Sequence, residues 1–363
     1  MAPLRPPIPA GGAHICSGVS TRFQIAESGA AAMLRSMVQS TLTLADRIRG
    51  CLWGQFAGDA MCLGSHWIYN LGEMEQRFPG GPKGFEAPAE GHYHYPKEPG
   101  DLTHYGEGGL VMLESIASQG ELDLADYWLR FFEHFGSPEY VGYIDQATKG
   151  TLENFAQFEE QDPNATYHFQ GGADDDQMCT ISRLAPVIVA HRTDPALFEV
   201  IERCTRVCQN NDRAVAYSKV YALILKDLLD GLDLHGAFHH AREVAPSLDP
   251  VLGPEIRRKI EAGIGSTLDE TTLAIQKFGQ ACPLPQSFPS ATICAAKHGH
   301  SLPKALLANL RAGGDNAGRG ALIGAWMGAL HGYPAIPAAW TTQLRAAPRI
   351  NGLVERIISR ATV

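Results

Sequence analysis

The segment Ala312 to Gly332 places a Gly-Gly-Asp-Asn turn directly before a helix of small and apolar residues. Glycine lets the backbone come close to a ligand, and the first turn of a helix offers unpaired N–H groups. Asp315 and Asn316 add a carboxylate and an amide to this turn, and Arg319 follows one turn later. Phosphate, ribose or a hard cation would fit such a turn. A glycine-rich turn that only caps a well-packed core helix fits it equally well.

A second segment, Gly100 to Glu114, also runs from glycine through a polar cluster into an apolar helix. The polar side chains crowded at this helix start are Thr103, His104, Tyr105 and Glu107. Histidine transfers protons near neutral pH, and a carboxylate stabilises a developing positive charge. We therefore treat the two helix starts as halves of one candidate site.

Together with Arg47 to Asn70, these two segments resemble the ADP-ribosylglycohydrolase family. Chains of that family open with R-x-x-G-x-x-x-G-x-x-x-GDA and close with GGD before a G-A-x-x-G-A-x-x-G helix, and both ends match here. The details HWIY (His66 to Tyr69), THYG (Thr103 to Gly106) and GGDN (Gly313 to Asn316) are most similar to the branch that contains the J-type jellyfish lens crystallins. The resemblance covers about Ala45 to Trp340 and implies hydrolysis of a ribosyl bond.

The chain departs from the family at the positions that hold paired magnesium ions. The family uses a Thr-Asp-Asp triplet, a glutamate after GDA and an Asp-x-Asp-Thr run. Aligned by motif, Thr103 keeps the threonine, but His104 and Tyr105 replace the two aspartates, and His66 lies near the expected glutamate. Asp315 is retained without the second aspartate. Magnesium prefers six oxygen ligands, so we expect no two-magnesium site and at most one Mg²⁺, on Thr103 and Asp315.

A third polar element, Gly171 to Pro186, resembles the family's central G-x-G-N-G-x-x-M-R-x-x-P motif. Its three consecutive acids are Asp174, Asp175 and Asp176, at an apparent helix start. The helix dipole stabilises negative charge there, and capping needs only one of the three acids. The alternative is that they replace the missing carboxylates and bind ribose hydroxyls or one cation.

The segment Phe85 to Gly100 is a loop rich in histidine, tyrosine and proline that we expect to cover the site as a lid. Tyr93 and Tyr95 would stack on an adenine or another planar ring. His92 and His94 form a His-x-His pair, but a metal site needs further ligands that the sequence does not specify. Tyrosines that pack over the cleft and histidines that face water are the alternative.

Two functional hypotheses follow. In the first, the chain is a hydrolase that cleaves an N- or O-ribosyl bond of an ADP-ribose-like substrate, which requires an acid at the leaving group and a carboxylate. Asp315 is the first choice for the carboxylate, Glu107 the second, and His104 the proton donor. The residues expected to bind the substrate are His66, Thr103, Tyr105, Asp174, Asp175, Asp176, Asn316 and Arg319.

In the second hypothesis, the ancestral site has lost its metals and its activity, and the chain is a crystallin-like binding or structural protein. We favour retained activity because the polar residues remain concentrated in two turns that should meet. The partner is then a small nucleotide or an ADP-ribosylated molecule, and no cofactor is required beyond the single possible Mg²⁺.

Composition predicts a large globular domain in the cytoplasm. The 363 residues are 45% hydrophobic and contain no apolar run long enough to cross a bilayer. The formal net charge of -9 argues against a broad nucleic-acid surface. Eight cysteines without a CxxC pair are typical of reduced thiols.

From Ala45 to Val363 the apolar residues recur at three- and four-residue spacing, which predicts a single compact all-α domain. Glycines at four-residue spacing should let helix backbones approach closely. Proline-rich breakers predict loops, one of them over Cys282 to Pro289. Residues 1–44 are poor in acids and are expected to be a disordered extension; an upstream start codon, with Met33 or Met37 as the true beginning, is favoured over a transit peptide.

Overall fold

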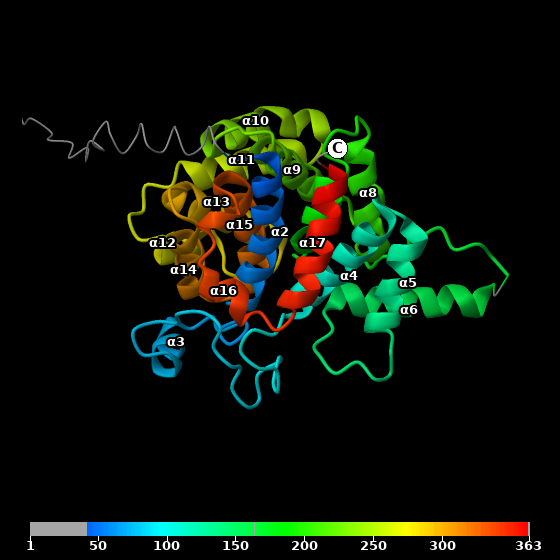
Figure 1. The fold of residues 1–363 in the computed structure, drawn as a ribbon, viewed down its shortest axis with the longest axis horizontal. Coiled ribbons are helices and arrows are strands. Elements are labelled where there is room, and N and C mark those ends of the chain that lie inside the picture. The colour runs from blue at the N-terminus through cyan, green and yellow to red at the C-terminus, as the bar shows by residue number, and fades with distance from the viewer. Residues whose placement is uncertain (1–41, 163, 362–363) are drawn as a thin grey trace, which may run out of the picture. The chain divides into compact units, whose positions relative to one another are not determined.

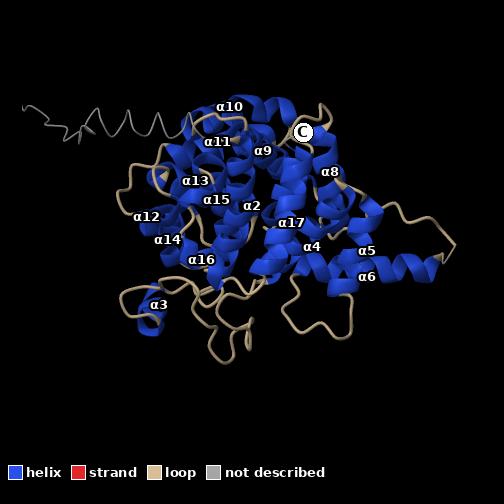
Figure 2. Ribbon diagram, in the orientation of Figure 1, coloured by secondary structure: helices blue, strands red, loops and turns tan. Residues whose placement is uncertain are grey.

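The fold is known from a computed structural model, which describes residues 42–162 and 164–361. All regular secondary structure in these residues is helical (Figures 1 and 2), and an isolated bridge between Ala173 and Gln209 is the nearest approach to a strand among them. The predicted all-α class is confirmed. The expectations for residues 1–41 lie outside the described residues.

The helices have the following bounds. The first part of the chain contains α2 (Leu44–Ala60), α3 (Leu71–Arg77), α4 (His104–Gln119), α5 (Leu124–Phe135) and α6 (Gln146–Gln161). The middle part contains the 3-10 helix η1 (Ile181–Arg183), α7 (Ala185–Ala190), α8 (Leu197–Cys208), α9 (Asp212–Leu229), α10 (Leu234–Leu248) and α11 (Gly253–Ile264). The last part contains α12 (Thr271–Phe278), α13 (Leu284–His298), α14 (Leu302–Ala312), α15 (Asn316–His331), η2 (Tyr333–Ala335), α16 (Ala338–Gln343) and α17 (Ala347–Ala361).

Helices α2 and α15 lie side by side at the centre of this domain (Figure 1). A Cβ atom on Gly54 would lie 2.1 Å from the carbonyl oxygen of Gly324, and one on Gly58 would lie 2.0 Å from that of Gly320. Contacts this short are impossible for a side chain, so the two backbones touch directly. The contacting residue numbers rise along α2, from 54 to 58, and fall along α15, from 324 to 320, so the two helices are antiparallel. The predicted close approach at glycine is confirmed.

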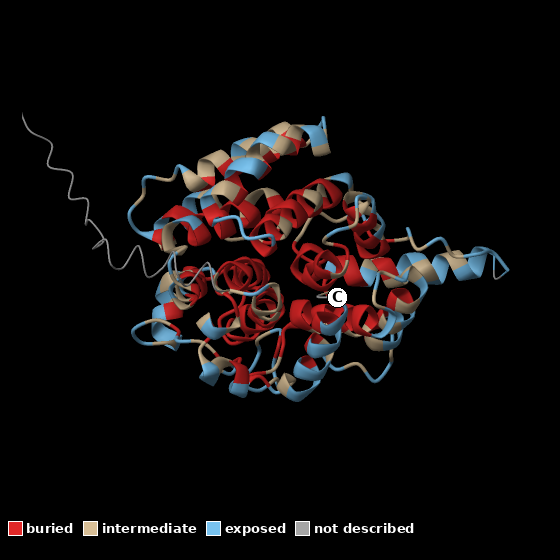
Figure 3. Ribbon diagram, turned by 45° about the horizontal axis from the view of Figure 1, so that its top comes forward, coloured by how far each residue is buried: buried red, intermediate tan, exposed pale blue. Residues whose placement is uncertain are grey.

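The other helices cover this central pair, and the buried residues gather along it (Figure 3). Trp326 of α15 is fully buried, with the rings of Tyr221, Phe238 and Phe288 at centroid distances of 5.7, 5.6 and 5.7 Å. Burial of each large apolar side chain contributes about 1.5–3 kcal/mol. None of the described helices combines the length and the apolar character needed to cross a membrane.

The prediction of a loop over Cys282 to Pro289 is wrong, because α13 begins at Leu284 and includes Pro289. Pro285 stands in the first turn, where no helical N–H bond is lost. Pro289 does remove one internal hydrogen bond. Burial of the neighbouring Phe288 against Trp326 offsets that loss, so tertiary packing overrides the local signal.

Three hydrogen bonds bring the candidate helix starts together at the end of α2. The backbone N–H of Thr103, the residue that caps α4, donates to Oδ2 of Asp59 over 2.9 Å, and its hydroxyl donates to Oδ1 of the same residue. On the other side, Trp67 N–H donates to the carbonyl oxygen of Gly314 over 2.7 Å. The segment after α2 thus joins the THYG turn to the GGDN turn.

Candidate functional site

The two predicted turns meet around the side chain of His66. Its Nε2 atom lies 3.6 Å from Oδ1 of Asp315, and its ring lies 6.0 Å from the ring of His104 and 5.8 Å from that of Tyr105, centroid to centroid. All four of these side chains are buried. The site is therefore a closed polar centre and not the open cleft that the sequence suggested.

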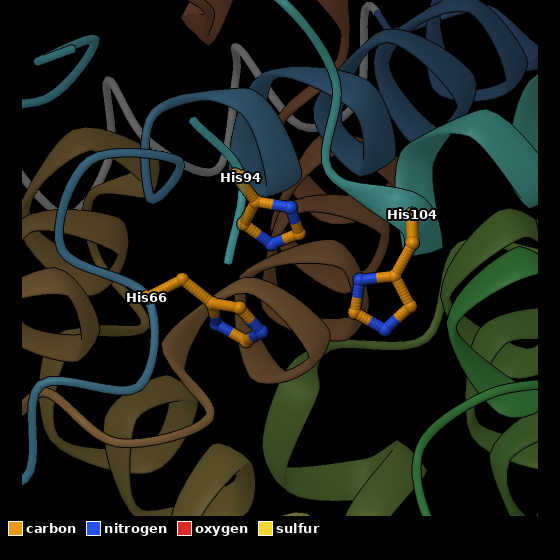
Figure 4. Close-up of side chains that lie close together, drawn as sticks. All are labelled: His66, His94 and His104. Atoms are coloured by element: carbon orange, nitrogen blue, oxygen red, sulfur yellow. The ribbon is translucent and has the colours of Figure 1, made fainter. Parts of the chain in front are cut away.

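A third imidazole, that of His94, completes this centre from the loop before α4. Its ring lies 5.4 Å from that of His66 and 5.5 Å from that of His104. Figure 4 shows the three rings turned toward a common point, and one nitrogen from each lies within 4.8 Å of the others. Only 1% of the His94 residue surface is exposed.

His92, the other member of the His-x-His pair, has a structural role instead. Its Nε2 atom lies 2.7 Å from the backbone oxygen of His66, and its Nδ1 atom accepts the backbone N–H of His94 over 3.1 Å. These bonds fasten the loop over the centre. His92 thus attaches the loop to the segment after α2, while His94 points toward the other two histidines.

Burial governs the charge state of the three imidazoles. It lowers the pKa of His66, His94 and His104 well below the ordinary value, and repulsion among the rings lowers the pKa of His66 and His94 further. All three are therefore neutral at physiological pH, with a lone pair on one nitrogen of each ring.

Asp315 is the retained carboxylate of the centre. Burial raises its pKa to about 7, although the positive charge of Arg319 acts in the opposite direction. Neither carboxylate oxygen accepts a well-oriented hydrogen bond from the described groups, but the Tyr105 hydroxyl and the Cys282 thiol lie close enough to lower the pKa of Asp315 somewhat. A carboxyl group with a pKa near the working pH is suited to proton transfer.

Asn316 orients the ring of His66. Its Nδ2 group donates to Ser65 Oγ over 2.9 Å and to the Leu310 oxygen over 3.1 Å, which turns Oδ1 toward His66 Nδ1 at 3.4 Å. A proton on Nδ1 would leave the Nε2 lone pair free. The backbone N–H of Ala317 also lies 3.4 Å from Nδ1 and favours the other tautomer, in which Nδ1 has the lone pair and Nε2 the proton. A positive charge near Nε2 would select the tautomer with the proton on Nδ1.

Glu107 lies beside this centre with different partners. Its carboxylate forms an ion pair with Lys97 at 2.7 Å and accepts the hydroxyl of Tyr140 at 2.6 Å. It faces a surface groove of about 680 Å³ whose walls also carry His134 and Arg349. Glu107 is the most accessible of the predicted catalytic groups.

The three central acids are engaged in contacts with nearby helices. Asp174 accepts from Asn211, Asp175 from Gln177 and Gln209, and Asp176 pairs with Arg213 at 3.0 Å. The expectation of a helix start at these acids is wrong, since the following helix, η1, begins only at Ile181.

Arg319 is fully buried and is a structural cation in this conformation. Its guanidinium donates to Asn309 Oδ1 over 2.9 Å, to the backbone oxygen of Gln280 over 3.0 Å and to that of Gly313. These bonds hold the GGDN turn in place and leave no guanidinium face toward solvent. Arg319 and Asn316 thus position Asp315 and His66.

The donor set does not fit a pair of magnesium ions. The Thr103 hydroxyl is occupied by Asp59 and also accepts the N–H of Tyr105 at 3.2 Å. A Cβ atom on Gly318 would lie 2.9 Å from Met178 and 3.0 Å from Oδ2 of Asp315, so no larger side chain fits there. Three imidazoles and few carboxylates are a poor match for an ion that requires oxygen ligands.

Two further residues of this centre have no signal in the sequence. Asp145 caps α6 and leaves Oδ2 unpaired, 3.5 Å from Nε2 of His104. Cys282 accepts the indole N–H of Trp67 at 3.3 Å. Asp59 of the GDA motif is a positioning residue, because it accepts the backbone N–H and the hydroxyl of Thr103.

Aromatic rings cover the centre on its solvent side. Trp67 packs edge-on against Tyr93 and Tyr143 at 5.1 and 4.7 Å and stacks on His94 at 5.6 Å. Its backbone is left-handed, with φ of 61°, which is costly for a bulky residue and is typical of functional sites. Tyr93 is 65% exposed, so this aromatic cover faces solvent.

Known proteins similar to this chain identify its family and share its fold. The sequence profile of the ADP-ribosylglycohydrolase family matches residues 40–363. The chain is 24% identical to Crystallin J1A and 22% identical to Crystallin J1B of Tripedalia cystophora, over 86% of this chain and 96% of each crystallin. A solved structure described as an ADP-ribosylglycohydrolase-related protein complex shares the fold, with a TM-score of 0.64 and 21% identity over 88% of this chain and 99% of that one. This chain belongs to the ADP-ribosylglycohydrolase family.

Proposed function

We propose that the protein hydrolyses an N- or O-ribosyl bond of an ADP-ribose-like substrate. The observation that carries this proposal is the Asp315 carboxylate, which is buried, accepts no well-oriented hydrogen bond and lies 3.6 Å from Nε2 of His66. A fully buried carboxylate with no well-oriented hydrogen bond is unfavourable for stability, so its position is best explained by a role in binding or chemistry.

In this mechanism Asp315 supplies the negative charge. As a carboxylate it stabilises the oxocarbenium character of the ribosyl carbon or takes a proton from the attacking water. His104 is neutral, so it assists the leaving group by donating an N–H hydrogen bond. His66 positions the Asp315 carboxylate. Glu107, which faces solvent in the neighbouring groove, is the second candidate for the carboxylate role.

Access to Asp315 requires the aromatic cover to move. Trp67, Tyr93 and Tyr143 lie between the histidines and solvent, on or beside the segments 85–100 and 137–145. The same rings offer flat apolar faces on which an adenine would stack. We therefore place the base of the substrate against this cover and its ribosyl bond beneath it.

The second candidate function is binding without turnover, as in a structural or storage protein. The closure of the centre supports it, because Asp315 and His66 have no exposed surface. The similarity to two proteins named crystallins points in the same direction.

A panel of N- and O-linked ADP-ribosyl compounds, assayed by release of ADP-ribose with and without added divalent metal, distinguishes the two functions. Asp315→Asn should lower kcat by about 10²–10⁴-fold while the helical circular dichroism is retained. Asp230→Asn is the matched control, since this exposed acid pairs with Arg192 and Lys226 and belongs to neither polar turn. Wild-type protein that binds ADP-ribose but hydrolyses nothing in the panel would favour the binding function. Activity in Asp315→Asn equal to wild type would remove Asp315 from the mechanism.

A further inference from the structure

We propose that His66, His94 and His104 form a binding site for one transition-metal ion of the zinc type, with one nitrogen of each ring as a ligand. The three residues come from three separate places in the chain: the segment after α2, the loop before α4 and the first residue of α4. Figure 4 shows their rings converging. This inference does not depend on ribosyl hydrolysis: with one nitrogen of His104 on the metal and the other bonded to Asp145, no N–H of His104 is left for a leaving group.

The spacing of the nitrogens is close to that of a metal site. In a tetrahedral zinc site with Zn–N distances of about 2.0–2.1 Å, the ligand nitrogens are about 3.4 Å apart. Here the three atoms lie within 4.8 Å of one another, so each needs to move inward by about 1 Å at most. Rotation of imidazole rings about χ2, which is a broad torsion, provides movements of this size.

The ring nitrogens lack other partners. Among the described residues, no hydrogen bond reaches Nε2 of His66 or either ring nitrogen of His94 and His104. Leaving one buried polar group unpaired costs about 1–3 kcal/mol, and here several such groups surround one point. A cation bound at that point would satisfy them together.

Neighbouring groups complete the arrangement expected around ligating histidines. Such histidines usually donate their second ring N–H to a carbonyl or carboxylate, which fixes the tautomer. Asn316 Oδ1 is placed to do this for His66, and the unpaired Oδ2 of Asp145 is placed to do it for His104. The carboxylate of Asp315, 3.6 Å from His66 Nε2, or a water molecule would take the fourth position.

The ligand type selects the metal. Imidazole suits zinc, copper, iron and nickel, whereas magnesium and calcium prefer oxygen ligands. A competing site exists on the surface, where the exposed His235 and His239 stand one turn apart on α10 with ring centroids 6.5 Å apart. Any test has to separate the buried cluster from this surface pair.

The test uses full-chain protein stripped of metal by a chelator and titrated with Co²⁺, which reports its ligands by visible absorption. Wild type should take up one Co²⁺ per chain in a four- or five-coordinate environment. His94→Ala and His104→Ala should each weaken this binding at least about 100-fold, since each removes a ligand. The double variant His235→Ala/His239→Ala is the matched control and should bind as wild type does.

Circular dichroism shows whether each variant keeps its fold. If both single variants unfold, proton NMR of the Co²⁺-loaded wild type decides, because each ligating histidine gives one strongly shifted, exchangeable N–H resonance. We expect such resonances from all three rings, and fewer than three would overturn the proposal. So would unchanged Co²⁺ binding in a folded His94→Ala variant, loss of binding in the surface double variant, or absence of Co²⁺ binding by wild type.

Discussion

The Nε2 atom of His66 and the Oδ1 atom of Asp315 lie 3.6 Å apart, although the two residues come from opposite ends of the domain sequence. The antiparallel pairing of α2 with α15 brings them together. His66 follows the C-terminal end of α2, and Asp315 immediately precedes the N-terminal end of α15. The glycine contacts between these two helices therefore set the geometry of the candidate site as well as the core.

The glycine contact between α2 and α15 is predicted to be sensitive to a single methyl group. In Gly54→Ala the new Cβ would lie 2.1 Å from the carbonyl oxygen of Gly324, so the helices must separate. We expect a loss of about 1–3 kcal/mol in the free energy of unfolding. Gly352→Ala is the matched control: this helical glycine has nothing within 4 Å, and the change should stabilise by about 0.5–1 kcal/mol. Urea denaturation measures both, and equal stability of the two variants would contradict the direct contact of the backbones.

Asp59 is predicted to make stability depend on pH. Burial raises the pKa of Asp59 to about 6, from 3.8 in the unfolded chain, although the hydrogen bonds from Thr103 lower it. Between pH 3.8 and about pH 6, Asp59 holds more protons in the folded state than in the unfolded chain. The stability that this proton binding contributes is therefore complete below about pH 4 and is lost as the pH rises through about 6. The contribution amounts to about 3 kcal/mol at most.

Asp59→Asn tests this prediction, because it keeps the size of the side chain and removes the titration: the amide oxygen can accept the backbone N–H of Thr103, and the amide N–H can donate to its hydroxyl oxygen. Wild type should lose stability relative to the variant between pH 4 and pH 7 in urea denaturation. Parallel profiles for the two proteins would show that the Asp59 carboxyl is not protonated in the folded state.

The purified protein is predicted to hold no stoichiometric pair of Mg²⁺ ions. The Thr103 hydroxyl is engaged by Asp59, and Gly318 leaves no space for a further carboxylate. Elemental analysis of the protein and a calorimetric Mg²⁺ titration measure this directly. Two tightly bound Mg²⁺ ions per chain would mean that backbone carbonyls or the acids at 174–176 have formed a different site.

The aromatic cover is predicted to bind the base of a nucleotide. Trp67→Ala should weaken binding of ADP-ribose by about 1–3 kcal/mol, the range for stacking of a base on an aromatic ring. Tyr95→Ala is the matched control, because Tyr95 is 54% exposed and makes none of the ring contacts of the cover. Fluorescence or calorimetric titration measures both, and equal affinities in the two variants would place the base elsewhere.

The sequence by itself determined the helical class, the close glycine contacts of α2 with α15 and the two polar turns. Each of these follows from local spacing: apolar residues every three or four positions, glycine every four, and polar groups next to a helix start. The same reasoning failed at Cys282 to Pro289, because the packing of Phe288 outweighs a proline in the helix.

Only the tertiary structure decided which polar residues share one centre. His94 points into the centre, whereas His92, two residues earlier, is bonded to the backbone oxygen of His66. Asp145 reaches His104 from the start of α6, which no local pattern indicates. Convergence of side chains from distant segments depends on how the helices pack, and that information is not contained in the spacing of any one of them.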